Sequence, residues 1–234
     1  MNARVAKALM LKNMYIAGRF RSPRIDYFPF YSDLRIAFSH NQVLKICASE
    51  IAKAIKKYNF DIIASREAAG VPFGVAVALR LNKDFLYLRK EAKGYNVNRV
   101  IEGDFKKGQR IFIVDDAMST GGDKKSIVNT LEKAGLKVIG IALVLDAYYG
   151  PRYRRSQKWL RRNKKYKYIK MLTWPELMNY AAKSGFMSDE LAKLLKKMIY
   201  DPRAWQKKES NWQQFKKLAA KEKNIIYDES FWGI

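Results

Sequence analysis

The segment 110–123 constrains the fold of this chain more than any other stretch of the sequence. It opens with an uninterrupted apolar run, 111–114, which is typical of a strand buried on both faces of a parallel sheet. Two acids, Asp115 and Asp116, follow directly, and a turn rich in hydroxyl groups and glycine then leads into a helical pattern that ends at Gly135. This order of elements predicts a ligand site where the strand ends.

The turn has the composition of a phosphate-binding loop. Glycine lets backbone N–H groups close around a phosphate, and the N-terminus of the following helix adds partial positive charge. The two acids could hold sugar hydroxyls or the hydration shell of Mg²⁺. From these residues alone, an ordinary strand–turn–helix with a glycine-rich loop remains the alternative. The candidate cradle residues are Ser119, Thr120, Gly121 and Gly122.

The string Val-Asp-Asp-x-x-Ser-Thr-Gly-Gly at 114–122 resembles the phosphoribosyl-diphosphate (PRPP) signature of type I phosphoribosyltransferases. The resemblance implies that Asp115, Asp116 and the four cradle residues bind PRPP, which brings Mg²⁺ to the acid pair. It also implies that Asp116 is catalytic, since the acids would stabilise the cationic ribosyl centre. One position departs from the family. Asp123 stands where a Ser or Thr usually helps to hold the 5-phosphate, although Lys124 and Lys125 beside it could offset its charge.

A second resemblance concerns the polar segment 89–103. By composition it is a solvated charge run, but Arg-Lys-Glu-Ala-Lys followed by Ile-Glu-Gly looks like the mobile catalytic loop of orotate phosphoribosyltransferases. The resemblance implies that Lys93, with Arg89 and Lys90, neutralises the departing diphosphate. In that family the loop usually covers the active site of the partner in a homodimer. Tyr95 stands where the family often has a histidine.

Two further segments match the same family. The aromatic, proline-interrupted segment 22–35 is similar to the hood that covers the base, which makes Phe28 and Phe30 candidate base contacts. Packing of both rings on the core is the alternative. Arg66 lies at the position of the diphosphate loop and could hold a diphosphate as a planar fork, or pair with the neighbouring Glu67.

Helical and strand patterns alternate between residues 43 and 146. This alternation predicts an α/β fold with a mainly parallel sheet and helices on both faces. We expect three regions: an N-terminal helix and hood at 1–40, a PRPP-binding core at 41–150, and a basic, mostly helical extension at 151–234. Spacing also predicts a helix within 1–20 that ends at Gly18, and a capping box from Thr173 that starts a helix.

Charge points to a different class of function. Lysine and arginine number 46 against 22 acids, a formal charge of +24, which favours a polyanionic partner. Residues 151–170 carry ten of these cations and no acid, interleaved with aromatic rings suited to stacking on bases. A plain basic surface helix is the alternative. The candidate nucleic-acid contacts are Arg152, Arg154, Arg155, Trp159, Arg161, Arg162, Lys164 and Lys165.

Two functions therefore compete on sequence alone. The first is transfer of phosphoribose from PRPP to orotate or another nucleobase. The second is a phosphoribosyltransferase fold that binds RNA or the ribosome, with catalysis reduced or lost. The single histidine, His40, excludes a histidine-rich metal site, and the single cysteine, Cys47, excludes an internal disulfide. No apolar run reaches the length of a membrane span, so we expect a cytoplasmic protein.

Overall fold

A computed structural model of the protein describes residues 1–22, 26–90, 100–118, 121–147, 159 and 165–232. Its centre is a six-stranded sheet in the order β5-β4-β3-β6-β7-β8, in which every neighbouring pair is parallel except β4 with β5. The strands are β3 (Ile62–Arg66), β4 (Asp84–Leu88), β5 (Ile101–Glu102), β6 (Arg110–Met118), β7 (Lys137–Asp146) and β8 (Lys167–Thr173). The predicted mainly parallel sheet is confirmed.

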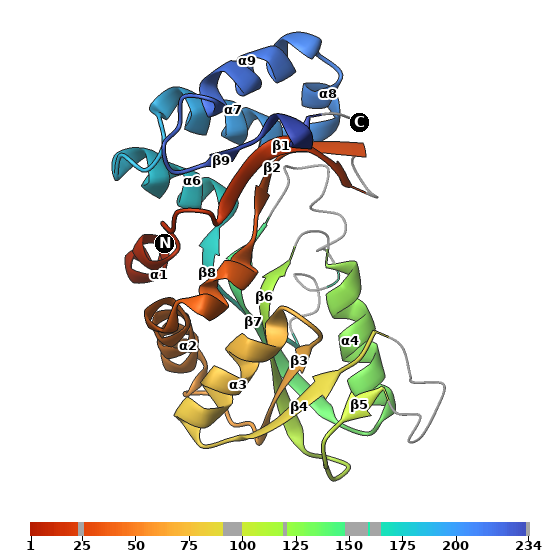
Figure 1. The fold of residues 1–234 in the computed structure, drawn as a ribbon. Helices are drawn as coiled ribbons and strands as arrows, with labels where there is room; N and C mark the ends of the chain where they lie inside the picture. The colour runs from red at the N-terminus through yellow and green to blue at the C-terminus, as the bar shows by residue number, and fades with distance from the viewer. Residues whose placement is uncertain (23–25, 91–99, 119–120, 148–158, 160–164, 233–234) are drawn as a thin grey trace.

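Three helices cover the two faces of this sheet (Figure 1). Phe112 and Val114 of β6 share one core with α2 (Asn41–Ile55) and α3 (Gly70–Leu81). Ile111 and Ile113 share the other core with α4 (Gly122–Lys133). Because side chains alternate along a strand, the unbroken apolar run serves both faces at once. The helices on both faces are thereby confirmed.

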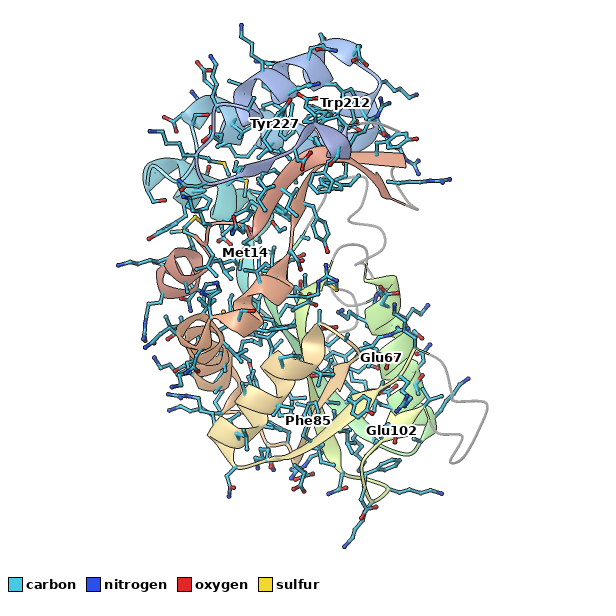
Figure 2. All side chains as sticks on the ribbon, viewed as in Figure 1. Met14, Glu67, Phe85, Glu102, Trp212 and Tyr227 are labelled. Carbon is cyan, nitrogen blue, oxygen red and sulfur yellow. The ribbon has the colours of Figure 1, made fainter. Side chains whose placement is uncertain are left out.

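A second sheet joins the two ends of the chain. It has the order β2-β1-β9, in which β1 (Tyr15–Ser22) pairs antiparallel with β2 (Asp26–Ser32) and parallel with β9 (Ile226–Tyr227). The C-terminal helices are α6 (Trp174–Lys183), α7 (Asp189–Tyr200), α8 (Pro202–Gln206) and α9 (Glu209–Ala219), with a short 3₁₀ turn, η2, at Glu229–Phe231. Figures 1 and 2 show the hairpin of β1 and β2 against these helices, with Trp212 on α9 and Tyr227 on β9.

Local sequence signals correctly marked the ends of two helices. Thr173 and Glu176 form the predicted reciprocal capping box, with the Thr173 N–H donating to Glu176 Oε2 at 2.7 Å and the Glu176 N–H to Thr173 Oγ1 at 3.3 Å. Gly135 has a φ of +87°, which lets the chain leave α4 through the left-handed region. None of the helices in the described ranges is both long and apolar enough to cross a bilayer.

Two expectations from spacing were wrong. Residues 1–20 are not one helix, because α1 covers only Ala3–Ala8 and the chain from Tyr15 onward is strand β1. There the hydrogen bonds to β2 outweigh a helical spacing of apolar residues. Strand β8 was also missed, since its lysines made 167–170 look like part of a charged segment. In the structure only Met171 and Leu172 of β8 are buried.

A 3₁₀ helix, η1 (Leu34–Ser39), completes the elements that surround the site described next.

Candidate active site

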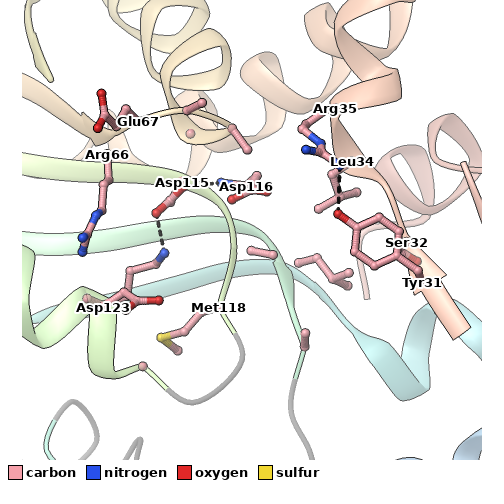
Figure 3. A pocket seen from close by; sticks show the side chains of 18 of the residues that line it. Tyr31, Ser32, Leu34, Arg35, Arg66, Glu67, Asp115, Asp116, Met118 and Asp123 are labelled. Carbon is pink, nitrogen blue, oxygen red and sulfur yellow. Dashed lines mark hydrogen bonds and ion pairs between the residues drawn. The ribbon is translucent and has the colours of Figure 1, made fainter. Parts of the chain in front are cut away.

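A cavity of about 710 Å³ opens at the carboxyl ends of β3, β6 and β7. Its walls come from β2 and the turn after it, the loop between β3 and α3, the end of β6 and the first turn of α4 (Figure 3). The volume is in the range of small-molecule sites, and the position is where open parallel sheets bind ligands. The segment 110–123 therefore contributes to this cavity, as its sequence predicts.

The two acids form the floor of the cavity. Asp115 is only 4% exposed, and its Oδ1 accepts the backbone N–H of Asp116 at 2.9 Å. Its Oδ2 accepts a hydrogen bond from the ammonium of Lys124, which is itself buried (dashed line, Figure 3). Both oxygens of Asp115 are thus engaged by the protein. Asp116 lines the cavity beside it and is half-buried.

The environment of Asp116 changes its acidity. Burial, together with the negative charge of Asp115, raises the pKa of the Asp116 carboxyl from 3.8 to about 7, although Lys124 acts in the opposite direction. Near neutral pH this group is balanced between its acid and its anion. Strongly perturbed acids in a cleft are typical of functional sites.

The candidate phosphate cradle lies at the start of α4. Gly121 is the N-cap residue with a φ of +79°, and Gly122 begins the helix. Asp123 in the first turn is exposed and lines the cavity. Ser119 and Thr120 lie outside the described residues. The sequence suggests that Lys124 offsets the charge of Asp123. In the structure its side chain turns inward and pairs with Asp115 instead.

The loop after β3 closes the floor from the side. A Cβ atom added at Gly70 would clash with Asp115 Oδ1, so only glycine permits this approach. Arg66 and Glu67 line the cavity, and Arg66 has no ion-pair partner among the described residues. Glu67 instead accepts the backbone N–H of Lys90 at 2.7 Å. The guanidinium of Arg66 is therefore available to an anionic ligand.

The candidate catalytic cations are not all at the cavity. Lys90 lines it, whereas Arg89 is outside the lining and pairs with Glu102 at 2.6 Å. Lys93 lies outside the described residues. The backbone N–H of Arg89 donates to the carbonyl of Val100 at 2.9 Å, so the two ends of the segment that contains Lys93 are held together. They are joined close to the cavity, since Lys90 belongs to its lining.

The hood provides the remaining wall. Phe28 and Phe30 both line the cavity, but Phe30 is 1% exposed and stacks on Tyr15 at 5.6 Å between ring centroids. Its packing role is therefore observed. Sequence reasoning missed Tyr31 and Arg35, which also line the cavity and are joined by a 3.0 Å hydrogen bond. The available signal was their position in the hood segment beside the two phenylalanines.

Two of the candidate nucleic-acid residues are described, and both make contacts within the protein. Trp159 is half-buried and meets Tyr166 edge to face at 6.1 Å. Lys165 pairs with Glu132 at 2.7 Å. The other six lie outside the described residues: Arg152, Arg154, Arg155, Arg161, Arg162 and Lys164.

Comparisons with known proteins agree with this geometry. The phosphoribosyl transferase domain family matches residues 38–181. The orotate phosphoribosyltransferase of Lactobacillus johnsonii is 32% identical over 77% of this chain and 84% of its own length. That of Sulfolobus acidocaldarius is 31% identical over 81% of this chain and 92% of its own.

Among solved structures, the UMP synthase of Leishmania donovani superposes with a TM-score of 0.73 at 28% identity. The match covers 85% of this chain and 42% of that one. The family model covers the acid pair, the start of α4 and the loop after β3, which together form the cavity floor. The chain therefore belongs to the type I phosphoribosyltransferase family.

Proposed function

We propose that the protein transfers the 5-phosphoribosyl group from PRPP to orotate. In this reaction the bond between ribose C1 and the diphosphate oxygen breaks, and diphosphate leaves with the electron pair. A bond forms between C1 and a ring nitrogen of orotate, and the proton of that nitrogen passes to the diphosphate or to water. One arrangement carries the proposal: the acid floor, the N-terminus of α4 and Arg66, which has no ion-pair partner in the described ranges, border a single cavity. Ribose hydroxyls can donate to the acids, the 5-phosphate can bind at the helix N-terminus, and the diphosphate can pair with Arg66. Orotate is proposed from the names of the relatives.

Within this proposal each wall has a role. Asp116 accepts ribose hydroxyls and stabilises positive charge at C1, while Asp115 supports it from below. The turn at Gly121 and Gly122 holds the 5-phosphate, and Arg66 with Lys90 meets the diphosphate. The base lies against the hood, where Tyr31 offers a hydroxyl to the oxygens of orotate. Arg35, which pairs with Asp33 at 2.6 Å, holds that hydroxyl in place.

Magnesium fits this site as a companion of the substrate. The described residues contain no group of three His, Cys, Asp or Glu side chains that could enclose a metal ion. Mg²⁺ commonly keeps several waters and binds through substrate phosphates, so we propose that it enters on the diphosphate of PRPP. When bound, the ion neutralises charge on the leaving group.

The test is direct. Purified protein with PRPP and Mg²⁺ should consume orotate and release diphosphate, and a panel of other nucleobases should react more slowly. Faster reaction with a purine would retain the transferase and overturn the choice of orotate. A lack of turnover with every nucleobase would overturn the transferase proposal itself.

Asp123 should weaken the binding of PRPP. Its carboxylate lines the cavity in the first turn of α4, where the 5-phosphate is expected. Because the residue is exposed, water screens the repulsion, and we expect Asp123→Ser to tighten PRPP about fivefold, or about 1 kcal/mol. Calorimetry with PRPP measures this. Asp189→Ser removes an exposed first-turn acid from α7 and is the matched control. Equal or weaker affinity in Asp123→Ser would refute a repulsive role.

We also propose a homodimer, as the family resemblance implies. Helix α3 exposes Val75 (36%) and Leu79 (78%), which lie one turn apart on the same side. A second copy of the chain would cover this apolar face by two-fold symmetry. Leu79→Glu should then give a monomer by light scattering, whereas Tyr200→Glu, an equally drastic change at another exposed site, should not. A monomeric wild type would end the proposal.

The RNA- or ribosome-binding hypothesis gains no support. The comparisons lead to phosphoribosyltransferases, and the described Trp159 and Lys165 are engaged within the protein. We do not propose it as a function.

A further inference from the structure

Lys124 is an unusual residue for its position. It belongs to the first turns of α4, next to the exposed Asp123 and Lys125, yet it is only 6% exposed. Lysine is almost never buried to this extent unless its charge is paired. Its partner is Asp115. Counted over side-chain atoms alone, Lys124 is 8% exposed and Asp115 is 5% exposed. Desolvating two charges is expensive, so such a contact is weak as a source of stability and calls for another explanation.

The contact links the two halves of the proposed PRPP site. Asp115 ends the continuous buried run at the start of β6, beside the acid that receives the ribose, while α4 supplies the phosphate cradle with its N-terminus. Gly70 approaches Asp115 from the third side. The carboxylate is therefore fixed from β6, from α4 and from the N-terminus of α3. Among these supports, Lys124 supplies the only side-chain charge on Asp115 that the described residues show.

The charge of the floor also depends on Lys124. Asp115 and Asp116 are adjacent in sequence, and two carboxylates so close repel each other. The ammonium of Lys124 balances the charge of Asp115 and so removes one negative charge from the floor. A substrate that brings several phosphate charges into the cavity meets less repulsion as a result.

We propose that Lys124 is a positioning residue for PRPP, which it serves by neutralising Asp115 and by joining the phosphate cradle on α4 to the acid floor on β6. The inference rests on the proposed phosphoribosyl transfer. PRPP spans both halves of the site, so its binding depends on their spacing. Orotate lies against the hood, so its binding does not depend on that spacing. The effect of Lys124 should therefore fall on one substrate.

Steady-state kinetics can separate this role from general support of the fold. Lys124→Met should raise the KM for PRPP at least about tenfold, and leave the KM for orotate within about threefold. Lys125→Met removes the same charge from the next, exposed residue and should change the KM for PRPP by less than about threefold and leave the KM for orotate unchanged. Lys124→Arg keeps a cation within reach of Asp115 and should recover much of the lost PRPP affinity. Equal changes in both constants, or no recovery with arginine, would reduce Lys124 to a structural residue and overturn the proposal.

Thermal unfolding tests the pair without any substrate. Lys124→Met leaves a buried carboxylate unpaired and should lower the Tm by on the order of 10 °C. Asp115→Asn should also lower it, but the double variant should lose clearly less than the sum of the two, because the pair is removed as a unit. Additive shifts would show that the two residues do not act on each other, and the proposal would fail.

The two proposals can fail separately. A wild-type protein that binds PRPP in calorimetry but turns over no nucleobase would end the transfer reaction only. The Lys124 proposal would then be decided by the ratio of PRPP affinities between the wild type and Lys124→Met, with Lys125→Met as the reference. A wild-type protein that binds no PRPP would overturn both.

Discussion

Asp116→Asn should lower kcat by about 10²–10³-fold, because it removes the negative charge that faces the developing ribosyl cation. Asparagine keeps the shape and one acceptor oxygen, so ribose hydroxyls still find a partner and the KM for PRPP should change much less than kcat. Steady-state rates with saturating orotate measure the effect. A variant with nearly normal kcat would show that charge at this position does not assist the transfer.

The same substitution should make the protein more stable at high pH. The folded protein holds the Asp116 proton up to about pH 7, whereas the unfolded chain releases it near 3.8. Between these values the native state binds more protons, so the stability of the wild type falls as pH rises through that window. Asparagine has no proton to lose.

The Tm of Asp116→Asn should therefore exceed that of the wild type at pH 8, and the difference should shrink toward pH 5. Asp104→Asn, at an exposed acid outside the cavity lining, is the control and should show no such trend. If the Asp116→Asn variant were less stable than the wild type at pH 8, that result would contradict a buried, destabilising carboxylate. An active-site residue often increases activity while it lowers the stability of the fold.

The core of this fold was readable from the sequence because its signals are local. An apolar run followed by acids and glycine predicts a buried strand and a helix beyond it, and both are observed as β6 and α4. It also predicts a ligand site where the strand ends, and the structure has a cavity there. The capping box at Thr173 needs only two residues three positions apart, and it is also present. These patterns do not depend on distant parts of the chain.

The remaining features depend on partners that are distant in sequence. Strand β1 pairs with β9 more than 200 residues away, and nothing in the local spacing of 1–20 reports that contact. The direction of Lys124 is also non-local. Its neighbours Asp123 and Lys125 are exposed, and only the buried carboxylate of Asp115 explains why its side chain turns inward. Sequence reasoning accordingly assigned Lys124 to the wrong acid.

Lys93→Ala should reduce turnover by about 10³-fold, the largest loss we expect from a single cation. The residue lies outside the described ranges, and its role follows from the loop resemblance. Arg89, the first cation of that loop, is already paired with Glu102 at 2.6 Å and lies outside the cavity lining. Lys93 is therefore the better candidate to meet the negative charge that develops on the leaving diphosphate.

Arg89→Ala is the matched control, because it removes a cation from the same loop. We expect it to lower kcat by no more than about tenfold, through loss of the Glu102 contact that holds the base of the loop. The reverse order of effects would move the leaving-group role to Arg89. If the loop serves the partner's site in the proposed homodimer, mixing Lys93→Ala with Asp116→Asn subunits should restore part of the activity. The mixed dimer contains one site in which the acid and the lysine are both intact. Without restoration, the lysine acts within its own subunit.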